Sequence, residues 1–451
     1  MRRRIPVLIL AFFALCILAG FAYNLSPINQ RLAVKVSELR TRLQYAISPP
    51  DEAVFVPQSE DSLPPPAFTR IAPTRLPTEI ENAPPADPEG GGSTPEATAT
   101  PAPSPTPLPE RVVLDGVVYV DQHNRWNYCG PANLAMALNF WGWEGTRDDI
   151  ARIVKPGVQD PSLDFIQQGR LDKNVMPYEL VDFVNNQTGL RALIRHGGDE
   201  ELVKRVIAGG FPVLVEKGYY EADYTGKVAW LGHYLFTTGY DETSGGFVVQ
   251  DAYLQSGQDM SVDFPTYMEG WRSFNYLFMV VYPPEREVEV MNLLGPYADP
   301  TWANQRAVEI AEAETQSFSG IDQFFAWFNL GTSHVQLLQY TEAAQAYDQA
   351  FIQYAALEND DAQRPYRIMW YQTGPYWAYY YTGRYQDVIN LANTTLHETT
   401  SEPTLEESLY WRGLAYEALG DITSAVADLQ EAVRLNPNFA PGLSQLNRIL
   451  S

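Results

Sequence analysis

The sequence predicts an α+β domain with an antiparallel sheet, followed by an all-α domain built from repeated helical hairpins. Helical patterns between residues 129 and 208 give way to β-branched and aromatic runs that end near residue 283. Self-similar helical segments follow from about residue 291 to residue 451. The chain has 451 residues, 45% of them hydrophobic, so it can form the cores of about two or three domains.

The charge balance excludes one broad class of partner. The chain carries 31 Lys and Arg residues against 55 Asp and Glu residues, a formal net charge of −24. A nucleic-acid partner is not expected, because phosphates need a basic surface. The 5 histidines and 2 cysteines are scattered without ligand-like pairing, so neither a metal site nor a cofactor is predicted.

Residues 1–23 are predicted to be a transmembrane anchor or a signal segment. Three arginines precede a run from Ile5 to Tyr23 that contains no charged residue. At ~1.5 Å per residue this run is roughly 28 Å long, close to the thickness of a bilayer core. The arginines predict a cytoplasmic N-terminus and extracellular domains. We favour a single-pass anchor in the cell membrane, because no small-x-small cleavage site follows; cleavage would instead give a secreted protein.

Two segments are expected to separate this anchor from the folded domains. Residues 24–47 have a helix-like juxtamembrane pattern. Residues 48–110 are rich in Pro, Ala, Thr, Glu and Ser, with "EGGGSTPEATATPAPSPTPLPE" as the extreme stretch. Such a composition cannot bury enough apolar surface to fold, so a disordered, extended linker is predicted.

The α+β domain is expected to span residues 111–284, with helices first and the sheet after them. Asp115-Gly116 predicts a turn between two strands in the stretch 111–120. Thr146 and Asp149 predict a capping box. Further elements are expected as helices after Cys129, after Thr146, from Pro177 and at 200–208 after Asp199, and as strands at 211–216, 233–240, 246–253 and 276–282.

Residues 291–451 contain repeated segments. "FNLGTSHVQLLQYTEAAQAYDQAF" aligns with "WRGLAYEALGDITSAVADLQEAV", which matches Gly331 to Gly413 and Tyr347 to Leu429. A weaker copy with Gly383 at its turn lies between them, and a capping helix is expected at the C-terminus. These segments resemble tetratricopeptide repeats, in which small residues let paired helices approach closely. The resemblance implies a docking surface for a protein partner or substrate.

Cys129 is the candidate nucleophile, in the stretch "RWNYCGPANLAMALNFWGW". Pro131 fits the first position of a helix, which would put Cys129 just ahead of it. Amide N–H groups at a helix start lower the pKa of a nearby thiol and so favour the reactive thiolate. A buried structural cysteine is the alternative that this local pattern leaves open.

His233 and Asp251 are the candidate partners of this thiol. His233 begins an aromatic-rich strand, and Asp251 ends the next strand, after the turn "DETSGG". Antiparallel neighbours joined by a short turn can bring these two residues together. The carboxylate would then fix the tautomer of the imidazole. His123 and His196 lie in loops, and the other two histidines lie in the repeat region.

Several segments together resemble the papain-like cysteine peptidases of the bacteriocin-processing, double-glycine type, in a free-standing exported form. The resemblance covers about residues 117–283 and rests on "NYCGPANLAMALNFWGW", "GGFPVLVE", "GHYLFTTGYDE", "VVQDAY" and "FPTYMEGWRSFNYLFMVVYP". It implies an α+β papain-like fold with Cys129 as nucleophile, His233 as general base and acid, and Asp251 as orienting residue. It also implies an oxyanion donor ahead of the cysteine, either Gln122 or Asn124, and we favour Gln122.

The predicted function is therefore a membrane-anchored, outward-facing cysteine peptidase that hydrolyses peptide bonds, with tetratricopeptide repeats that dock substrate or partner. Two alternatives remain open. The domain can be a catalytically silent scaffold, or it can be a transglutaminase-like acyl transferase, which uses the same three residue types in the same order.

Overall fold

The computed structural model describes residues 55–58, 107–123, 125, 127–156, 174–222, 228–357, 364–397 and 405–451. The predicted anchor at 1–23, the juxtamembrane helix at 24–47 and most of the linker at 48–110 lie outside these ranges. No helix among the described residues is both long and apolar enough to cross a membrane.

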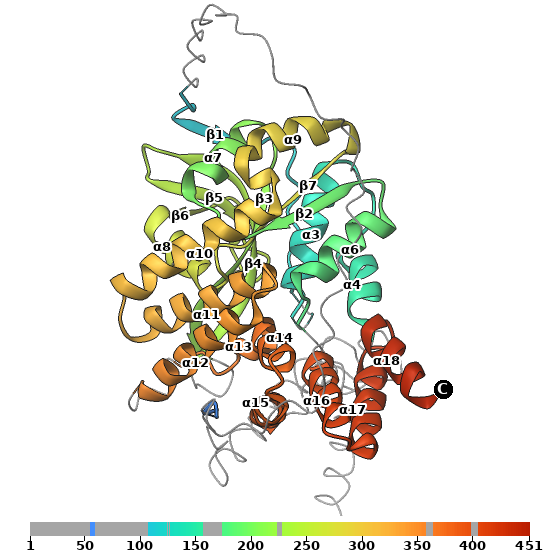
Figure 1. Ribbon diagram of the computed structural model, residues 1–451. Coiled ribbons are helices and arrows are strands. Elements are labelled where there is room, and N and C mark those ends of the chain that lie inside the picture. The colour runs from blue at the N-terminus through green and yellow to red at the C-terminus, as the bar shows by residue number, and fades with distance from the viewer. Residues whose placement is uncertain are drawn as a thin grey trace, which may run out of the picture.

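The first folded unit is built on a seven-stranded sheet in which every pairing is antiparallel (Figure 1). The strand order is β2-β7-β3-β4-β5-β6, and β1 pairs with β4 outside this path. The four strands expected from the apolar runs are confirmed. The bounds are β1 Arg111–Val113, β2 Arg191–Arg195, β3 Val213–Ala222, β4 Val228–Asp241, β5 Gly246–Gln250, β6 Met260–Asp263 and β7 Phe278–Tyr282.

Helices cover both faces of this sheet (Figure 1). On one face lie α3 (Cys129–Phe140), α4 (Arg147–Val154) and α6 (Pro177–Gln187). On the other lie α7 (Glu200–Ala208), α8 (Phe264–Arg272), α9 (Glu287–Leu294) and the start of α10 (Pro300–Ser317). Because both faces are covered, the central strand β7 is buried along its whole length and reads as a continuous apolar run.

The helix starts follow the predicted capping chemistry. Thr146 and Asp149 form a capping box ahead of α4, and Pro177 is the first residue of α6. Asp199 caps α7 by accepting a hydrogen bond from the Leu202 N–H at 2.7 Å. These local signals position the helices that surround Cys129.

Two expectations for this domain are wrong. Residues 111–120 do not form a hairpin, because β1 pairs with the distant β4, with Val112 opposite Tyr240, and the chain after Gly116 is not a strand. The helices also do not all precede the sheet, since β2 comes before α7 and α8 lies between β6 and β7. A short apolar run gives no signal of whether its partner strand is near or far in sequence, which explains both errors.

The C-terminal region is helical from residue 287 onward. Its remaining helices pack mainly on their neighbours in sequence, with the most extensive contacts between α11 and α12, between α16 and α17, and between α10 and α11. Residues 287–303 pack with the sheet in the same hydrophobic cluster, rather than with these hairpins. The bounds are α11 Gly320–Gln336, α12 Tyr340–Ala356, α13 Ile368–Tyr371, α14 Gly374–Tyr381, α15 Tyr385–His397, α16 Glu406–Ala418, α17 Ile422–Leu435 and α18 Ala440–Leu450.

Two glycines show why the aligned repeat segments fold alike. A β-carbon at Gly331 would lie 2.7 Å from the ring of Tyr347, and one at Gly413 would lie 3.2 Å from Leu429 Cγ. In each hairpin, the glycine of the first helix therefore faces the aligned large residue of the second helix. The missing side chain allows the two helices to approach closely.

The helical hairpins pack directly against the sheet domain. The ring of Trp230 in β4 stacks on Phe274 with centroids 5.5 Å apart, and it also contacts Phe325 of α11 and Tyr371 of α13. Nearby, Asn275 Nδ2 donates to Ser333 Oγ at 2.9 Å. The first half of β4, the strand that carries His233, is thus joined to the repeat region by a mixed aromatic and polar contact.

Candidate active site

Cys129 is the first residue of α3, and Tyr128 is its N-cap. Pro131 is therefore the third helical residue, rather than the first as the sequence predicted. Residues 130–138 are all buried, whereas Cys129 is partly exposed. The thiol thus sits at the accessible end of a helix fixed in the core. The first turn holds no acidic residue, so the N–H groups that lack intrahelical acceptors favour a thiolate.

Asn133 joins the Cys129 turn to strand β4. Its side chain is fully buried, and Nδ2 donates to the Cys129 carbonyl oxygen at 2.9 Å and to the Tyr234 carbonyl oxygen at 3.0 Å. The amide therefore fixes the helix start against the residue that follows His233. Asn133 lies within the cysteine motif, but the helical pattern does not predict its hydrogen bond to the distant Tyr234.

His233 and Asp251 meet as the sequence predicted. His233 Nε2 lies 3.0 Å from Asp251 Oδ1, and both side chains are buried. The backbone N–H groups of Tyr253 and Leu254 also donate to Asp251 Oδ1, at 2.9 and 3.3 Å. The carboxylate is held in place by these bonds. It engages Nε2, which leaves Nδ1 as the ring nitrogen available to Cys129.

The pKa values of Cys129 and His233 are shifted in opposite directions. Burial alone would raise the pKa of the Cys129 thiol, but a hydrogen bond with His233, its charge and the Tyr234 backbone lower it below its usual value. Burial likewise opposes the charged imidazole, yet Asp251 and Cys129 raise the pKa of His233 to about 9. The two shifts favour a thiolate–imidazolium pair at neutral pH.

Gln122 lies in a loop that is attached to the Asp251 segment. Its backbone N–H donates to the Ala252 carbonyl oxygen at 2.8 Å, and Arg147 of α4 bonds to the flanking residues Asp121 and His123. The buried Oε1 atom of Gln122 has no hydrogen-bond partner within the described structure. Because a rotation of the side-chain amide exchanges its O and NH₂, the unpartnered end of Gln122 can offer a ligand either an acceptor or a donor. Asn124 lies outside the described residues.

The two loop histidines have other partners. His123 Nε2 lies 3.0 Å from the Tyr253 carbonyl oxygen, which ties the Gln122 loop to the residues after Asp251. His196 is half-buried beside Asn304, and desolvation lowers its pKa to about 4. Neither imidazole contacts Cys129 in the described structure, so His233 is the histidine that the fold brings to the thiol.

Two charged residues near the thiol were missed by sequence reasoning. Lys155, at the end of α4, is fully buried, its Nζ donates to the Asn127 carbonyl oxygen at 2.9 Å, and its charge helps to lower the Cys129 pKa. Glu216 of β3 is buried, and burial, followed by the charge of Cys129, raises its pKa well above the usual value. A lysine after a helix and a glutamate in a strand ordinarily indicate solvent-facing positions, which is why the pattern did not reveal them.

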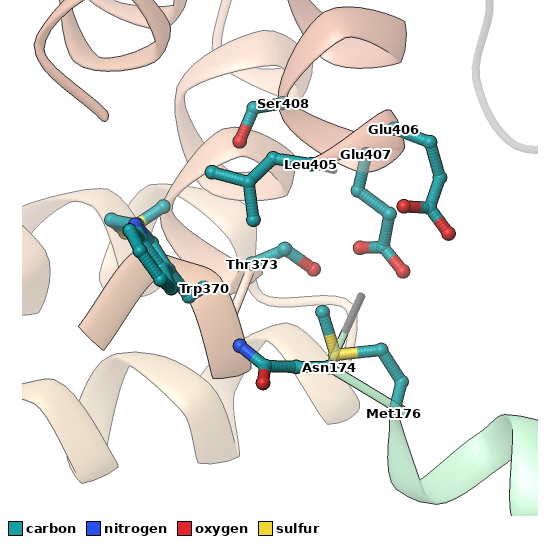
Figure 2. Close-up of a pocket in the computed structure, with 9 residues that line it drawn as sticks. Asn174, Met176, Trp370, Thr373, Leu405, Glu406, Glu407 and Ser408 are labelled. Carbon is teal, nitrogen blue, oxygen red and sulfur yellow. The ribbon is translucent and has the colours of Figure 1, made fainter. Parts of the chain in front are cut away.

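A narrow cavity lies between the sheet domain and the repeat region (Figure 2). One wall is formed by Asn174 and Met176, and Val175 between them accepts a hydrogen bond from the Tyr234 hydroxyl at 2.9 Å. The opposite wall belongs to the repeat region and is formed by Met369, Trp370, Thr373, Leu405, Glu406, Glu407 and Ser408. One wall of the cavity is therefore linked to β4 through Val175 and Tyr234, and Cys129 is not among the lining residues.

Comparison with known families finds two matches in this chain. Residues 114–279 match the family model described as the Peptidase_C39 like family. Over these residues the chain is similar to the C39-like peptidases. The match includes α3, most of the sheet and all four candidate site residues, and it supports a cysteine peptidase domain. Residues 406–439 match the tetratricopeptide repeat model, so the C39-like domain is followed by tetratricopeptide-repeat sequence.

A solved structure described as that of a candidate C39-like peptidase from Bacillus anthracis is also similar. It shares 17% sequence identity, and the match covers 38% of this chain and 98% of that chain, with a TM-score of 0.31. No match was found among curated proteins. Within the described part of the C39-like domain and the repeats, no group of three or more His, Cys, Asp or Glu residues could hold a metal ion.

Proposed function

We propose that the protein is a thiol peptidase that cleaves amide bonds with Cys129, His233 and Asp251. The observation that carries this proposal is the ordered hydrogen-bonded set, in which Asp251 engages His233 and His233 engages Cys129. Each partner serves one step of acyl transfer: a nucleophile, a proton carrier and a group that orients the carrier. The C39-like family match supports the same chemistry.

The first half-reaction breaks the amide bond. The Cys129 thiolate attacks the carbonyl carbon, a C–S bond forms, and the carbonyl oxygen takes the negative charge. The His233 imidazolium then donates its proton to the amine nitrogen, and the C–N bond breaks to release the amine. The Cys129 backbone N–H, at the helix start, and the side-chain NH₂ of Gln122 would donate hydrogen bonds to the oxyanion.

The second half-reaction regenerates the enzyme. Neutral His233 accepts a proton from water, the hydroxide attacks the thioester carbon, and the C–S bond breaks to restore the thiolate. Asp251 keeps its charge throughout and stabilises the imidazolium through the 3.0 Å contact. An amine in place of water would give acyl transfer instead, because the first half-reaction is common to both.

The cellular setting is part of the proposal. The uncharged run from Ile5 to Tyr23 would anchor the chain in a membrane with the peptidase domain outside. The repeat region would dock a protein substrate or partner, which the tetratricopeptide match supports. The cavity between the two units would then lie near the path of a docked chain.

Labelling with a peptide that carries a thiol-reactive warhead tests this function. We expect covalent labelling at Cys129 in the wild type, and none at this position in Cys129→Ala or His233→Ala. His334→Ala is the matched control, since the imidazole of His334 in α11 bonds to the nearby Gln339 side chain. A Cys129→Ala protein that still hydrolyses peptides would overturn the proposal. Turnover only with an added amine acceptor would favour the acyl transferase, and no labelling of the wild type would favour a silent scaffold.

A further inference from the structure

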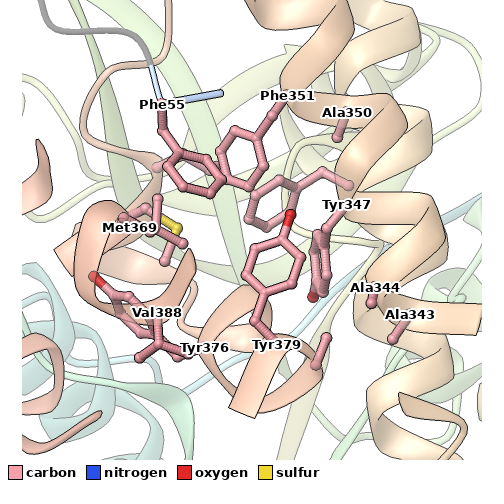
Figure 3. Close-up of a cluster of buried hydrophobic side chains, with 14 of the residues drawn as sticks. Phe55, Ala343, Ala344, Tyr347, Ala350, Phe351, Met369, Tyr376, Tyr379 and Val388 are labelled. Atoms are coloured by element: carbon pink, nitrogen blue, oxygen red, sulfur yellow. The ribbon is translucent and has the colours of Figure 1, made fainter. Parts of the chain in front are cut away.

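A short piece of the N-terminal linker is inserted into the repeat region. Phe55 is only 5% exposed and lies within the hydrophobic cluster of the repeat helices (Figure 3). Its ring meets that of Phe351 in α12 edge to face, with centroids 4.9 Å apart, and that of Tyr379 in α14 at 6.0 Å. These two partners lie 296 (351 − 55) and 324 (379 − 55) positions further along the chain.

The backbone of this segment is also bound. The Gln58 N–H donates to Asp387 Oδ1 at 3.0 Å, and the Gln58 carbonyl oxygen accepts from Arg384 Nη2 at 3.3 Å. The N–H and the C=O of Gln58 are therefore both hydrogen bonded. Their partners are Arg384, in the turn between α14 and α15, and Asp387, in the first turn of α15. Val56 between the two anchor points is 65% exposed, so its side chain contributes little to recognition.

The side chains that bind Gln58 form a prearranged charged group. Arg384 is 2% exposed and lies 2.7 Å from both Asp348 and Asp387. Burial raises the pKa of Asp387, while the Gln58 N–H and Arg384 oppose that rise. Buried charges are retained only where partners compensate their desolvation. Here a peptide backbone from outside the repeats supplies part of that compensation.

We propose that the repeat region has a binding groove for an extended peptide with a phenylalanine, and that residues 55–58 occupy this groove in cis. The ligand class is Phe-x-Pro-x: the ring fills the aromatic site, and the last residue offers its N–H and C=O to Asp387 and Arg384. Pro57 fixes an extended backbone between the two contacts. A partner protein with such a motif must displace the resident segment. This inference does not depend on the peptidase chemistry.

A fluorescent peptide with the sequence of residues 53–59, AVFVPQS, tests the groove on the full-length chain. Phe55→Ala empties the aromatic site without altering the groove itself. We expect this variant to bind the peptide at least about tenfold more tightly than the wild type, because a tethered ligand competes at high effective concentration. Equal affinity of the two chains would overturn the cis occupancy.

Two altered peptides serve as controls for specificity, and both leave the protein unchanged. A peptide with alanine in place of phenylalanine loses the buried ring, and a peptide N-methylated at the glutamine loses the N–H that Asp387 accepts. Each should bind the Phe55→Ala chain at least about tenfold more weakly than AVFVPQS. If the Phe55→Ala chain does not bind AVFVPQS, or binds the alanine peptide equally well, the groove is overturned.

Discussion

The ring of Tyr371, in α13 of the repeat region, lies against Gly232, the residue that precedes His233 in β4. A β-carbon added at Gly232 would be 2.7 Å from this ring, and the Gly232 backbone is hydrogen bonded to the tyrosine. Tyr371 is also close enough to Cys129 for the thiolate charge to contribute to raising its pKa. The repeat region therefore contacts the strand that carries the proposed general base.

Gly232→Ala should disturb this contact. The added methyl group would collide with Tyr371 and with Phe274, so we expect a loss of stability of about 1–3 kcal/mol and a lower kcat/KM. Urea unfolding and peptide hydrolysis measure the two effects. Gly189→Ala is the control, because a methyl group there meets no atom within 4 Å. Equal behaviour of the two variants would show that the packing at Gly232 is not needed.

Asn133→Asp should separate the Cys129 turn from β4. The substitution preserves shape but replaces the NH₂ group, which bonds to the Cys129 and Tyr234 carbonyl oxygens, with an acceptor. We expect a stability loss of about 1–3 kcal/mol and a fall in kcat/KM of about tenfold. Asn447→Asp, on the exposed face of α18, controls for added charge. Unchanged turnover in Asn133→Asp would contradict a positioning role for the amide.

The kcat/KM of the enzyme should show a bell-shaped dependence on pH. Activity requires the Cys129 thiolate, so it rises as pH passes the lowered pKa of that thiol. It also requires the His233 imidazolium, so it falls as pH passes about 9. In Asp251→Asn the imidazolium loses its charged partner, and the basic limb should move to lower pH. The kcat/KM profile of both proteins tests this; an unmoved basic limb would show that Asp251 does not set the His233 pKa.

Glu216→Gln should have little effect near neutral pH. Burial raises the Glu216 pKa well above its usual value and so favours the uncharged carboxyl, which glutamine matches in shape and in its lack of charge. We expect kcat/KM at pH 7 to stay within about twofold, while the chemically identical change at Asp251 costs at least about tenfold. A large loss in Glu216→Gln would mean that this residue is ionised in the active protein.

Local signals in the sequence account for much of the site. The helix start at Cys129, the caps at Thr146 and Asp199, and the meeting of His233 with Asp251 follow from motif, capping and strand patterns. Such features depend on residues that are near in sequence or on neighbouring strands. For this reason, simple periodicity and turn chemistry were sufficient to predict them.

The remaining features depend on contacts between distant segments. The pairing of β1 with β4, the two bonds of Asn133 and the burial of Lys155 each need the assembled fold. The insertion of Phe55 into the repeats is the clearest case, because the flanking composition predicts only an extended linker. A single sequence carries no periodic signal for such contacts, so they emerge only from the packed structure.

The reaction rate of Cys129 with iodoacetamide as a function of pH, followed by mass spectrometry of the Cys129 peptide, tests the central claim most directly. The account predicts a wild-type thiol that is already alkylated rapidly below pH 7, and a His233→Ala thiol whose reactivity rises only near pH ~8.5, as for an ordinary cysteine. A wild-type Cys129 that stays inert until pH ~8.5, or that is unchanged by His233→Ala, would contradict it.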